Sequence, residues 1–423
     1  MCLLGAGLYY ALLRMFSGLP SRLAETSKDI AIYRRAGEAI LAGEVPYRDF
    51  FIEYPPGSLP SFVPPALFSG SREAYASLFA SEMALALVAA LVLTAYAARS
   101  LGRPWLLPAG VFAAAALLLH PVAVTRYDAV VALTLAAAVA LSSSPAFGRK
   151  GAAGAATFVA AWVSLGFGAA AKFVPALTTL PLAFLGNREG ERLFGGVVRS
   201  TAWGVAVFFG VGAAFFLPVF LLAGEDFARS LAYHADRGLQ LESLGASVLM
   251  KLGYLEAVVL EYGAWEVLGQ GVAFLSSASL LITAVLLVVT GAVAYREYRK
   301  GRFGPEQFPR FAAACVLALL LGSKVLSPQY VIWLLPLVPL GAGGVWGLGV
   351  SAVFLAVCWI TTQVFPYHYL EVVQGRFPGL DILLGRNLLL LVLWGLMLSL
   401  PSGSEPVGRE GMRKTAAEQG DLS

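Results

Sequence analysis

The sequence predicts an all-α polytopic membrane protein with about 12 membrane-spanning helices, within a range of 11 to 13. The mean hydropathy is +0.74, and only 13% of the 423 residues are charged, whereas soluble domains carry about 25% charged residues. Apolar runs long enough to cross a bilayer also recur from end to end. Because these runs are continuous, they disfavour a transmembrane β-barrel, whose strands alternate apolar and polar residues.

The predicted spans are apolar stretches separated by polar or charged segments. They lie at 2–19, 75–98, 105–121, 128–143, 152–170, 174–186, 200–222, 271–294, 311–322, 329–343, 345–363 and 387–400. Spans 174–186 and 311–322 are short for a full crossing, so each is expected either to be a broken helix or to extend into its neighbour. We expect residues 1–400 to form a single integral membrane domain, and the polar residues 401–423 to form a disordered tail.

Lysine and arginine are distributed unequally between the short loops, which predicts the orientation. The loops at 99–104, 144–151, 187–199 and 296–310 hold 12 Lys and Arg residues, and those at 121–127, 171–173 and 323–328 hold 3. The first set is therefore expected in the cytosol of a cell membrane protein, together with the N- and C-termini. The outer side then contains a first extracytoplasmic loop at 20–74, a second large segment at 223–270 and a loop at 364–386. The net charge of +4 does not suggest nucleic acid binding.

The first outer loop is expected to begin with a short helix near the membrane. Thr26 or Ser27 is a suitable N-cap for a helix that starts near Lys28. Asp29 then lies in the first turn, where the helix dipole favours an ionised carboxylate. The residues at helical spacing on the same side are Tyr33, Ala36 and Ile40, and Gly43 ends the helix. Asp29 is either the first-turn residue of a solvated loop helix or a carboxylate with a chemical role.

The other unusual polar clusters also fall on the predicted outer side, which favours one extracytoplasmic site. Arg126 and Asp128 flank Tyr127 at the ends of two spans, where they either anchor the helices or support a ligand. Lys172 and Lys324 each stand at the outer end of a short span with a proline close behind. Each lysine either extends its ammonium to the interface or contacts an anion.

A further pair of basic side chains follows the seventh predicted span. His234 and Arg237 are three residues apart, so on a helix they share one face. They either grip a phosphate, for which arginine offers a bidentate fork, or belong to a polar helix on the membrane surface.

Several kinds of chemistry lack sequence support. The chain has no phosphate-binding loop of the G-x-x-x-x-G-K-[ST] type, no H-E-x-x-H and no cluster of Cys and His. The glycines of 341–349 follow no strand of a dinucleotide-binding unit. We therefore expect no cofactor and no metal site.

Taken together, these segments resemble glycosyltransferase family 87. The resemblance rests on Asp29-x-x-x-Tyr33, on GEVPYRDF at 43–50, on EYPPG at 53–57 and on the later clusters around 126–128, 172–175, 234–243 and 324–330. It extends from residue 29 to about 340. It implies a GT-C fold of the kind found in polyprenol-phosphate-mannose-dependent mannosyltransferases, with a catalytic aspartate in the first outer loop at the position of Asp29. It also implies a lipid-phosphate sugar as donor, and an outward site needs such a donor because nucleotide sugars are cytosolic.

The implied reaction is an inverting transfer of mannose or another hexose from a polyprenyl-phosphate sugar to an extracytoplasmic glycolipid or glycan. The base is expected to be Asp29, with Asp49 or Glu53 as alternatives, because a carboxylate can take the proton of the acceptor hydroxyl. Cations are expected to stabilise the leaving phosphate. The residues expected to bind substrate or phosphate are Tyr33, Tyr54, Arg126, Asp128, Lys172, His234, Arg237, Lys324 and Gln329.

Two other functions remain open from the sequence. A dozen spans with buried charges also suit a multi-span transporter or a flippase of a lipid-linked substrate, although charges on one side fit a midplane transport site poorly. An oligosaccharide ligase or polymerase would also face outward. Activity with a purified polyprenyl-phosphate sugar separates these possibilities.

Overall fold

The computed structural model describes residues 1–19, 28–194 and 197–400, with the side chains of 187–194, 197–198 and 234–235 outside that description. Within this part of the chain, six helices are long and apolar enough to cross a membrane. They are α5 (Arg72–Ser100), α9 (Ala152–Ala171), α11 (Val197–Ala223), α14 (Val272–Arg299), α16 (Gly344–Thr362) and α18 (Gly379–Ser399). Their length and composition confirm the membrane-protein class predicted from hydropathy.

The other six predicted spans coincide with shorter apolar segments. Four of them are α1 (Cys2–Ser17), α6 (Leu106–Leu118), α8 (Asp128–Ser142) and α15 (Gln307–Gly322). The fifth combines a 3₁₀ turn, η2 (Val174–Thr178), with α10 (Thr179–Phe194). The sixth contains two further 3₁₀ pieces, η3 (Pro328–Leu334) and η4 (Val338–Leu340).

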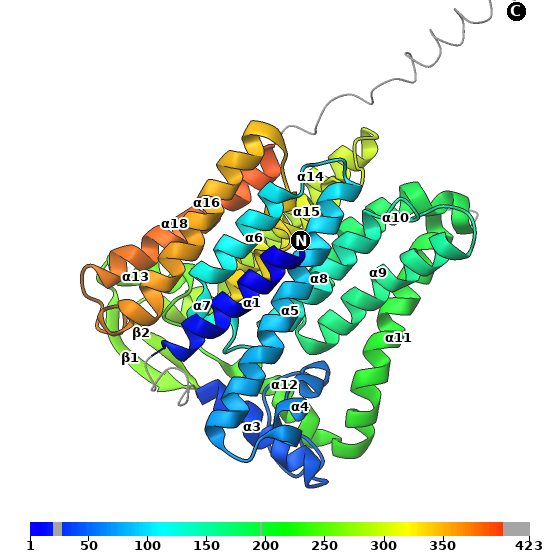
Figure 1. The fold of residues 1–423 in the computed structure, drawn as a ribbon. Helices are drawn as coiled ribbons and strands as arrows, with labels where there is room; N and C mark the ends of the chain where they lie inside the picture. The colour runs from blue at the N-terminus through cyan, green and yellow to red at the C-terminus, as the bar shows by residue number, and fades with distance from the viewer. Residues whose placement is uncertain (20–27, 195–196, 401–423) are drawn as a thin grey trace, which may run out of the picture.

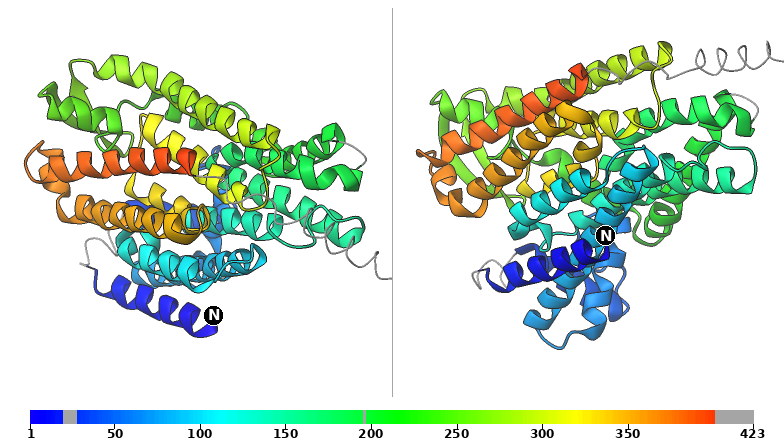
Figure 2. Two further views of the ribbon diagram at one scale, coloured as in Figure 1. Left: turned by 90° about the horizontal axis from the view of Figure 1, so that it is seen from above. Right: turned by 45° about the horizontal axis from the view of Figure 1, so that its top comes forward.

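The bundle is built around α15, in which every residue except Leu319 is buried. A helix that is apolar on all sides belongs either in a protein core or in a membrane, and α15 takes the central position in the bundle. Neighbouring helices surround it, and α5 packs along α8 while α8 packs along α9 (Figure 1). The helices α16 and α18 lie side by side in every view (Figure 2). In contrast, the apolar window of α11 has no buried residues, so this helix presents its side chains to its surroundings.

The polar segments gather at one end of the bundle, along the left and lower part of Figure 1. The first loop supplies α3 (Lys28–Leu41), η1 (Pro56–Ser61) and α4 (Val63–Phe68). Later segments supply α7 (His120–Ala123), α12 (Glu225–Asp236), α13 (Leu244–Lys251), a π-helical turn η5 (Gln363–Tyr367) and α17 (Tyr369–Val373).

The segment 223–270 also contains β structure that the all-α prediction missed. Strands β1 (Leu255–Glu261) and β2 (Ala264–Gly269) pair as an antiparallel hairpin. The two residues between them, Tyr262 and Gly263, both have positive φ, at 46° and 74°. This is the backbone of the tight turn that hairpins favour, and glycine supplies it without strain.

Two predicted spans differ in form from the structure. Residues 329–343 do not form one α-helix, because Pro336 and Pro339 lack the N–H groups that a continuous helix needs. The last span begins at Gly379 instead of 387, and so includes Arg386. The charge of Arg386 does not end the helix because its side chain is fully buried and paired within the protein.

Candidate active site

A cavity of about 480 Å³ opens at the polar end of the bundle. Its walls come from all six segments that the charge distribution assigns to the outer side, together with Gln329 and Tyr330, which follow directly. Its charged lining residues are Lys28, Asp29, Glu53, Arg126, Lys172, Arg237 and Glu242. Among the described residues, four cations and three carboxylates therefore face one space, which is of the size that small-molecule sites usually have.

Asp29 lies in the first turn of α3 and is held on both carboxylate oxygens. Its Oδ2 is 2.7 Å from Nη2 of Arg126, and its Oδ1 accepts a 3.1 Å hydrogen bond from the Tyr54 hydroxyl. The side chain keeps 25% exposure. Since each carboxylate oxygen has two acceptor sites, Asp29 retains acceptor capacity toward the cavity.

The predicted face of α3 packs into an aromatic cluster beneath Asp29. Tyr33 is 1% exposed and stacks on Phe62 with ring centroids 4.4 Å apart, while Tyr54 and Tyr127 meet its edges. Tyr33 therefore supports the site from below and does not line the cavity. Gly57 allows the Pro55-Pro56 turn to close onto the end of α9, because a Cβ there would lie 2.5 Å from the carbonyl carbon of Ala170.

Lys172 is the most tightly positioned cation in the cavity wall. Its Nζ is 2.7 Å from Oδ1 of Asp128 and 4.8–5.1 Å from the ring centroids of Tyr127, Tyr330 and Trp333. The Trp333 indole also donates to Asp128 Oδ1, at 2.7 Å. Asp128 is 1% exposed and does not line the cavity, so it acts as the buried counter-ion of Lys172.

Arg237, at the C-terminal end of α12, also lines the cavity. Within the described residues, its buried Nε has no hydrogen-bond partner. The adjoining backbone is fixed, since Lys324 Nζ donates to the Arg237 carbonyl and the Gly238 N–H donates to Glu266 Oε2 at 2.9 Å. Burial lowers the pKa of Lys324 and raises the pKa of Glu266. Lys324 thus holds Arg237 in place and is not among the lining residues.

The alternative carboxylates of the first loop have different surroundings. Glu53 lines the cavity and hydrogen-bonds to Tyr233 of α12. Asp49 does not line it: its carboxylate is bound by Arg48 at 2.8 Å and by the Val45 N–H at 2.7 Å. These hydrogen bonds, with that of Arg48 the larger effect, lower the pKa of Asp49 to about 2. The cavity therefore favours Asp29 and Glu53 over Asp49.

Two other predicted residues complete the comparison with the sequence. Gln329 lines the cavity, next to Tyr330. His234 is part of α12, but its side chain is outside the description, as are the predicted capping residues Thr26 and Ser27. Their roles stay predictions.

The structure adds lining residues that the sequence had not singled out. Lys28 precedes Asp29, and the hairpin contributes Tyr262 and Trp265. Glu242 and Tyr369 also face the cavity and hydrogen-bond to each other. Burial raises the pKa of Glu242 to about 7, against the lowering effect of Arg386. Glu242 belongs to the 234–243 segment on which part of the family resemblance rests. The hairpin could have been found from the Tyr262-Gly263 pair, which stands between two apolar runs and is typical of a tight turn.

Comparison with known proteins identifies the family. The model for glycosyltransferase family 87 matches residues 51–328, which is more than half of the chain. The chain belongs to glycosyltransferase family 87. It is therefore a membrane glycosyltransferase, as the resemblance implied, and the matched region contains Glu53, Arg126, Lys172, Arg237 and Lys324. No curated protein matches this family 87 chain.

Two solved structures have a partly similar course of the chain. ArnT from Cupriavidus metallidurans bound to undecaprenyl phosphate is 13% identical, with a TM-score of 0.48, over 94% of this chain and 76% of that one. The archaeal oligosaccharyltransferase AglB from Archaeoglobus fulgidus, in complex with an inhibitory peptide and a dolichol-phosphate, is 13% identical with a TM-score of 0.39, over 97% and 59% of the two chains.

Proposed function

We propose that this family 87 enzyme transfers a sugar, mannose or another hexose, from a polyprenyl-phosphate sugar to an extracytoplasmic glycolipid or glycan acceptor, with inversion. The observation that carries the proposal is that Asp29 and the cations Arg126, Lys172 and Arg237 face one cavity. All of them belong to segments that the positive-inside rule assigns to the outer side. A donor that reaches this side must be carried across on a lipid, because nucleotide sugars are cytosolic.

Asp29 is assigned the role of general base. The acceptor hydroxyl gives its proton to the Asp29 carboxylate while its oxygen attacks the anomeric carbon. The bond from that carbon to the phosphate oxygen breaks, and its electron pair leaves with the polyprenyl phosphate. Because attack and departure are on opposite faces, the configuration inverts. Arg126 and Tyr54 orient the carboxylate through their contacts with its two oxygens.

Lys172 and Arg237 are assigned to the leaving phosphate. A phosphate needs no strong acid to depart, but the negative charge that grows on it needs fixed cations. Lys172 is fixed by Asp128 and three aromatic rings, so its charge requires little reorganisation during the reaction. Arg237 lines the cavity, and its guanidinium offers N–H groups that can bind phosphate oxygens.

The test compares two aspartates of the same loop in purified enzyme with a polyprenyl-phosphate hexose and candidate acceptors. Asp29→Asn should abolish transfer at normal membrane expression, whereas Asp49→Asn should retain it, because Asp49 is turned to Arg48 and Val45. Transfer that survives Asp29→Asn removes Asp29 from the role of base, and Glu53→Gln is then the decisive variant. Movement of the sugar lipid across vesicles without a new glycosidic bond would favour a transporter instead.

The sugar and the acceptor can be identified in cells. Mass spectrometry of cell-envelope glycolipids and glycans in a strain that lacks the gene should show one missing hexose. The shortened glycan or lipid would be the acceptor, and complementation with the Asp49→Asn variant should restore the missing sugar.

A further inference from the structure

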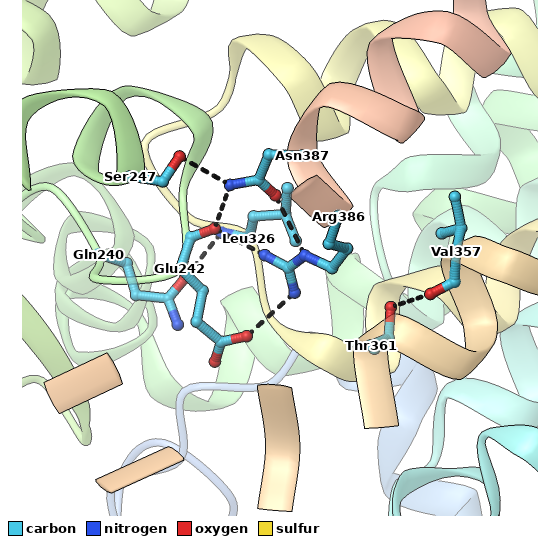
Figure 3. A network of polar contacts seen from close by, with 8 residues as sticks. All are labelled: Gln240, Glu242, Ser247, Leu326, Val357, Thr361, Arg386 and Asn387. Carbon is cyan, nitrogen blue, oxygen red and sulfur yellow. Dashed lines mark hydrogen bonds and ion pairs between the residues drawn. The ribbon is translucent and has the colours of Figure 1, made fainter. Parts of the chain in front are cut away.

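Glu242 is a carboxylate buried in the cavity wall and held by a partner from the last helix. Arg386 of α18 donates from Nη1 to Glu242 Oε2 at 3.1 Å and from Nη2 to the Glu242 carbonyl at 2.7 Å (Figure 3). The Glu242 side chain is 2% exposed, and that of Arg386 is 0% exposed. Because Arg386 is fully buried, water does not reach the ion pair from its side, and the Glu242 carboxylate can meet a ligand only from the cavity that it lines.

A second residue of α18 fixes the backbone around Glu242. The Asn387 amide donates to the Glu242 carbonyl at 3.2 Å and to the Ser247 hydroxyl at 3.0 Å, and it accepts from Arg386 Nε at 3.1 Å (Figure 3). These contacts use backbone and hydroxyl groups, so they tether the segment to α18 without the Glu242 carboxylate. A buried ion pair can often be replaced by apolar residues of similar volume at no cost in stability. The fold alone therefore does not account for a carboxylate at this position.

The neighbours of Glu242 supply complementary polar groups. Gln240 stands two residues earlier, and its Oε1 accepts the Leu326 N–H at 2.7 Å, which leaves its amide nitrogen for another partner. In Figure 3, this nitrogen and the Glu242 oxygen that does not meet Arg386 point to the same side of the network. Both residues line the cavity, as does Tyr369, which hydrogen-bonds to Glu242.

We propose that Glu242 and Gln240 form a subsite that binds the hydroxyl groups of a sugar, with Arg386 as the positioning residue. A carboxylate acceptor beside an amide donor matches neighbouring hydroxyls, each of which donates and accepts. This inference rests on the proposed function of the cavity and deepens it, because it assigns sugar recognition to the lining residues that follow the phosphate cation Arg237 in the chain. The hydroxyls belong either to the donor sugar or to a sugar of the acceptor.

Loss of the carboxylate should weaken the use of one substrate. A hydrogen bond to a charged group corresponds to roughly a 10- to 150-fold effect on binding. In Glu242→Gln, the KM of either the donor or the acceptor should rise by about this factor, while the KM of the other stays within about twofold. A donor site also predicts that polyprenyl phosphate without a sugar binds the variant as tightly as it binds the parent. Glu371→Gln is the matched control, since that half-buried carboxylate pairs with His368 and does not line the cavity.

A second variant protects the test against misfolding, because Glu242→Gln leaves the Arg386 charge buried without its counter-ion. The double variant Glu242→Gln/Arg386→Gln removes both charges and should fold as the parent does while keeping the raised KM. If the double variant folds and both KM values equal those of the parent, the subsite is refuted and Glu242 has only a structural role. If the parent itself makes no product from any polyprenyl-phosphate sugar, the proposed function fails. The donor subsite would then be refuted if the parent binds sugar-bearing and sugar-free lipid with equal Kd values and Glu242→Gln leaves both values unchanged. The acceptor subsite would be refuted if the parent and Glu242→Gln bind the acceptor with equal Kd values.

Discussion

Replacement of Lys172 by methionine separates its structural contribution from its catalytic one. The variant leaves Asp128, which is 1% exposed, with the Trp333 indole but without the ammonium 2.7 Å away. Removal of one partner of a buried ion pair costs about 3–5 kcal/mol, because the other charge remains uncompensated. The loss of one fixed charge at a leaving group reduces kcat by roughly 10²- to 10³-fold. Lys172→Met should therefore lower both stability and turnover.

The double variant Lys172→Met/Asp128→Asn isolates the second effect. Asparagine keeps an oxygen for the Trp333 N–H and removes the unpaired charge, so most of the lost stability should return while turnover stays low. Thermal unfolding in detergent measures the first quantity, and transfer from a polyprenyl-phosphate hexose measures the second. Lys251→Met is the control, because Lys251 and its partner Asp381 are exposed and such surface pairs contribute about 0–1 kcal/mol. Parental turnover in the folded double variant would refute the assignment of Lys172 to the phosphate.

Three further predictions address the remaining parts of the site. Tyr54→Phe keeps the aromatic packing but removes the hydrogen bond to Asp29. The free energy of unfolding should fall by about 1.5–3 kcal/mol, and turnover should fall by roughly tenfold because the Asp29 carboxylate loses one of its two orienting contacts. Gly57→Ala should lower the unfolding temperature, because its Cβ would lie 2.5 Å from the Ala170 carbonyl carbon. Gly70→Ala is the control and should not lower it, because no atom lies within 4 Å of a Cβ there. Equal unfolding temperatures for the two variants would contradict the close contact between Gly57 and α9. Burial raises the pKa of Glu242 from 4.5 to about 7, so the folded state binds one proton more than the unfolded state between these pH values. The stability that this protonation contributes is present at low pH and is lost as the pH rises through about 7. Glu242→Gln should remove this part of the pH dependence of unfolding.

The sequence predicted the features that depend on local pattern. Apolar runs located the helices, and the arginine and lysine bias placed on one side the segments that later form the cavity. The residue spacing predicted that Asp29 lies in the first turn of a helix and that Tyr33 lies on its buried face, and α3 has both features. The resemblance to family 87 was confirmed by the match over 51–328.

The sequence did not predict which charges pair, because the partners are far apart in the chain. Lys172 meets Asp128 across 44 residues, and Arg386 meets Glu242 across 144. No local spacing distinguishes Lys172 as a lining cation from Lys324, which turns to the Arg237 carbonyl. The hairpin was missed because its strands are short and lie in 223–270, which was predicted only as a large extracytoplasmic segment. The Tyr262-Gly263 turn between them was the available signal.

The pairing of Glu242 with Arg386 has a consequence for the order in which the cavity is assembled during synthesis. A chain is synthesised from its N-terminus, so Asp29, Lys172 and Glu242 all leave the ribosome before α18 does. Until that helix enters the membrane, Glu242 lacks its guanidinium and the 240–247 segment lacks the amide of Asn387. A nascent chain that has inserted α16 but not α18 therefore contains Asp29 and Lys172 but lacks the side chains that hold Glu242 in the cavity wall. Only after α18 has entered the membrane does Glu242 gain the contacts with Arg386 and Asn387 that hold it in the cavity wall.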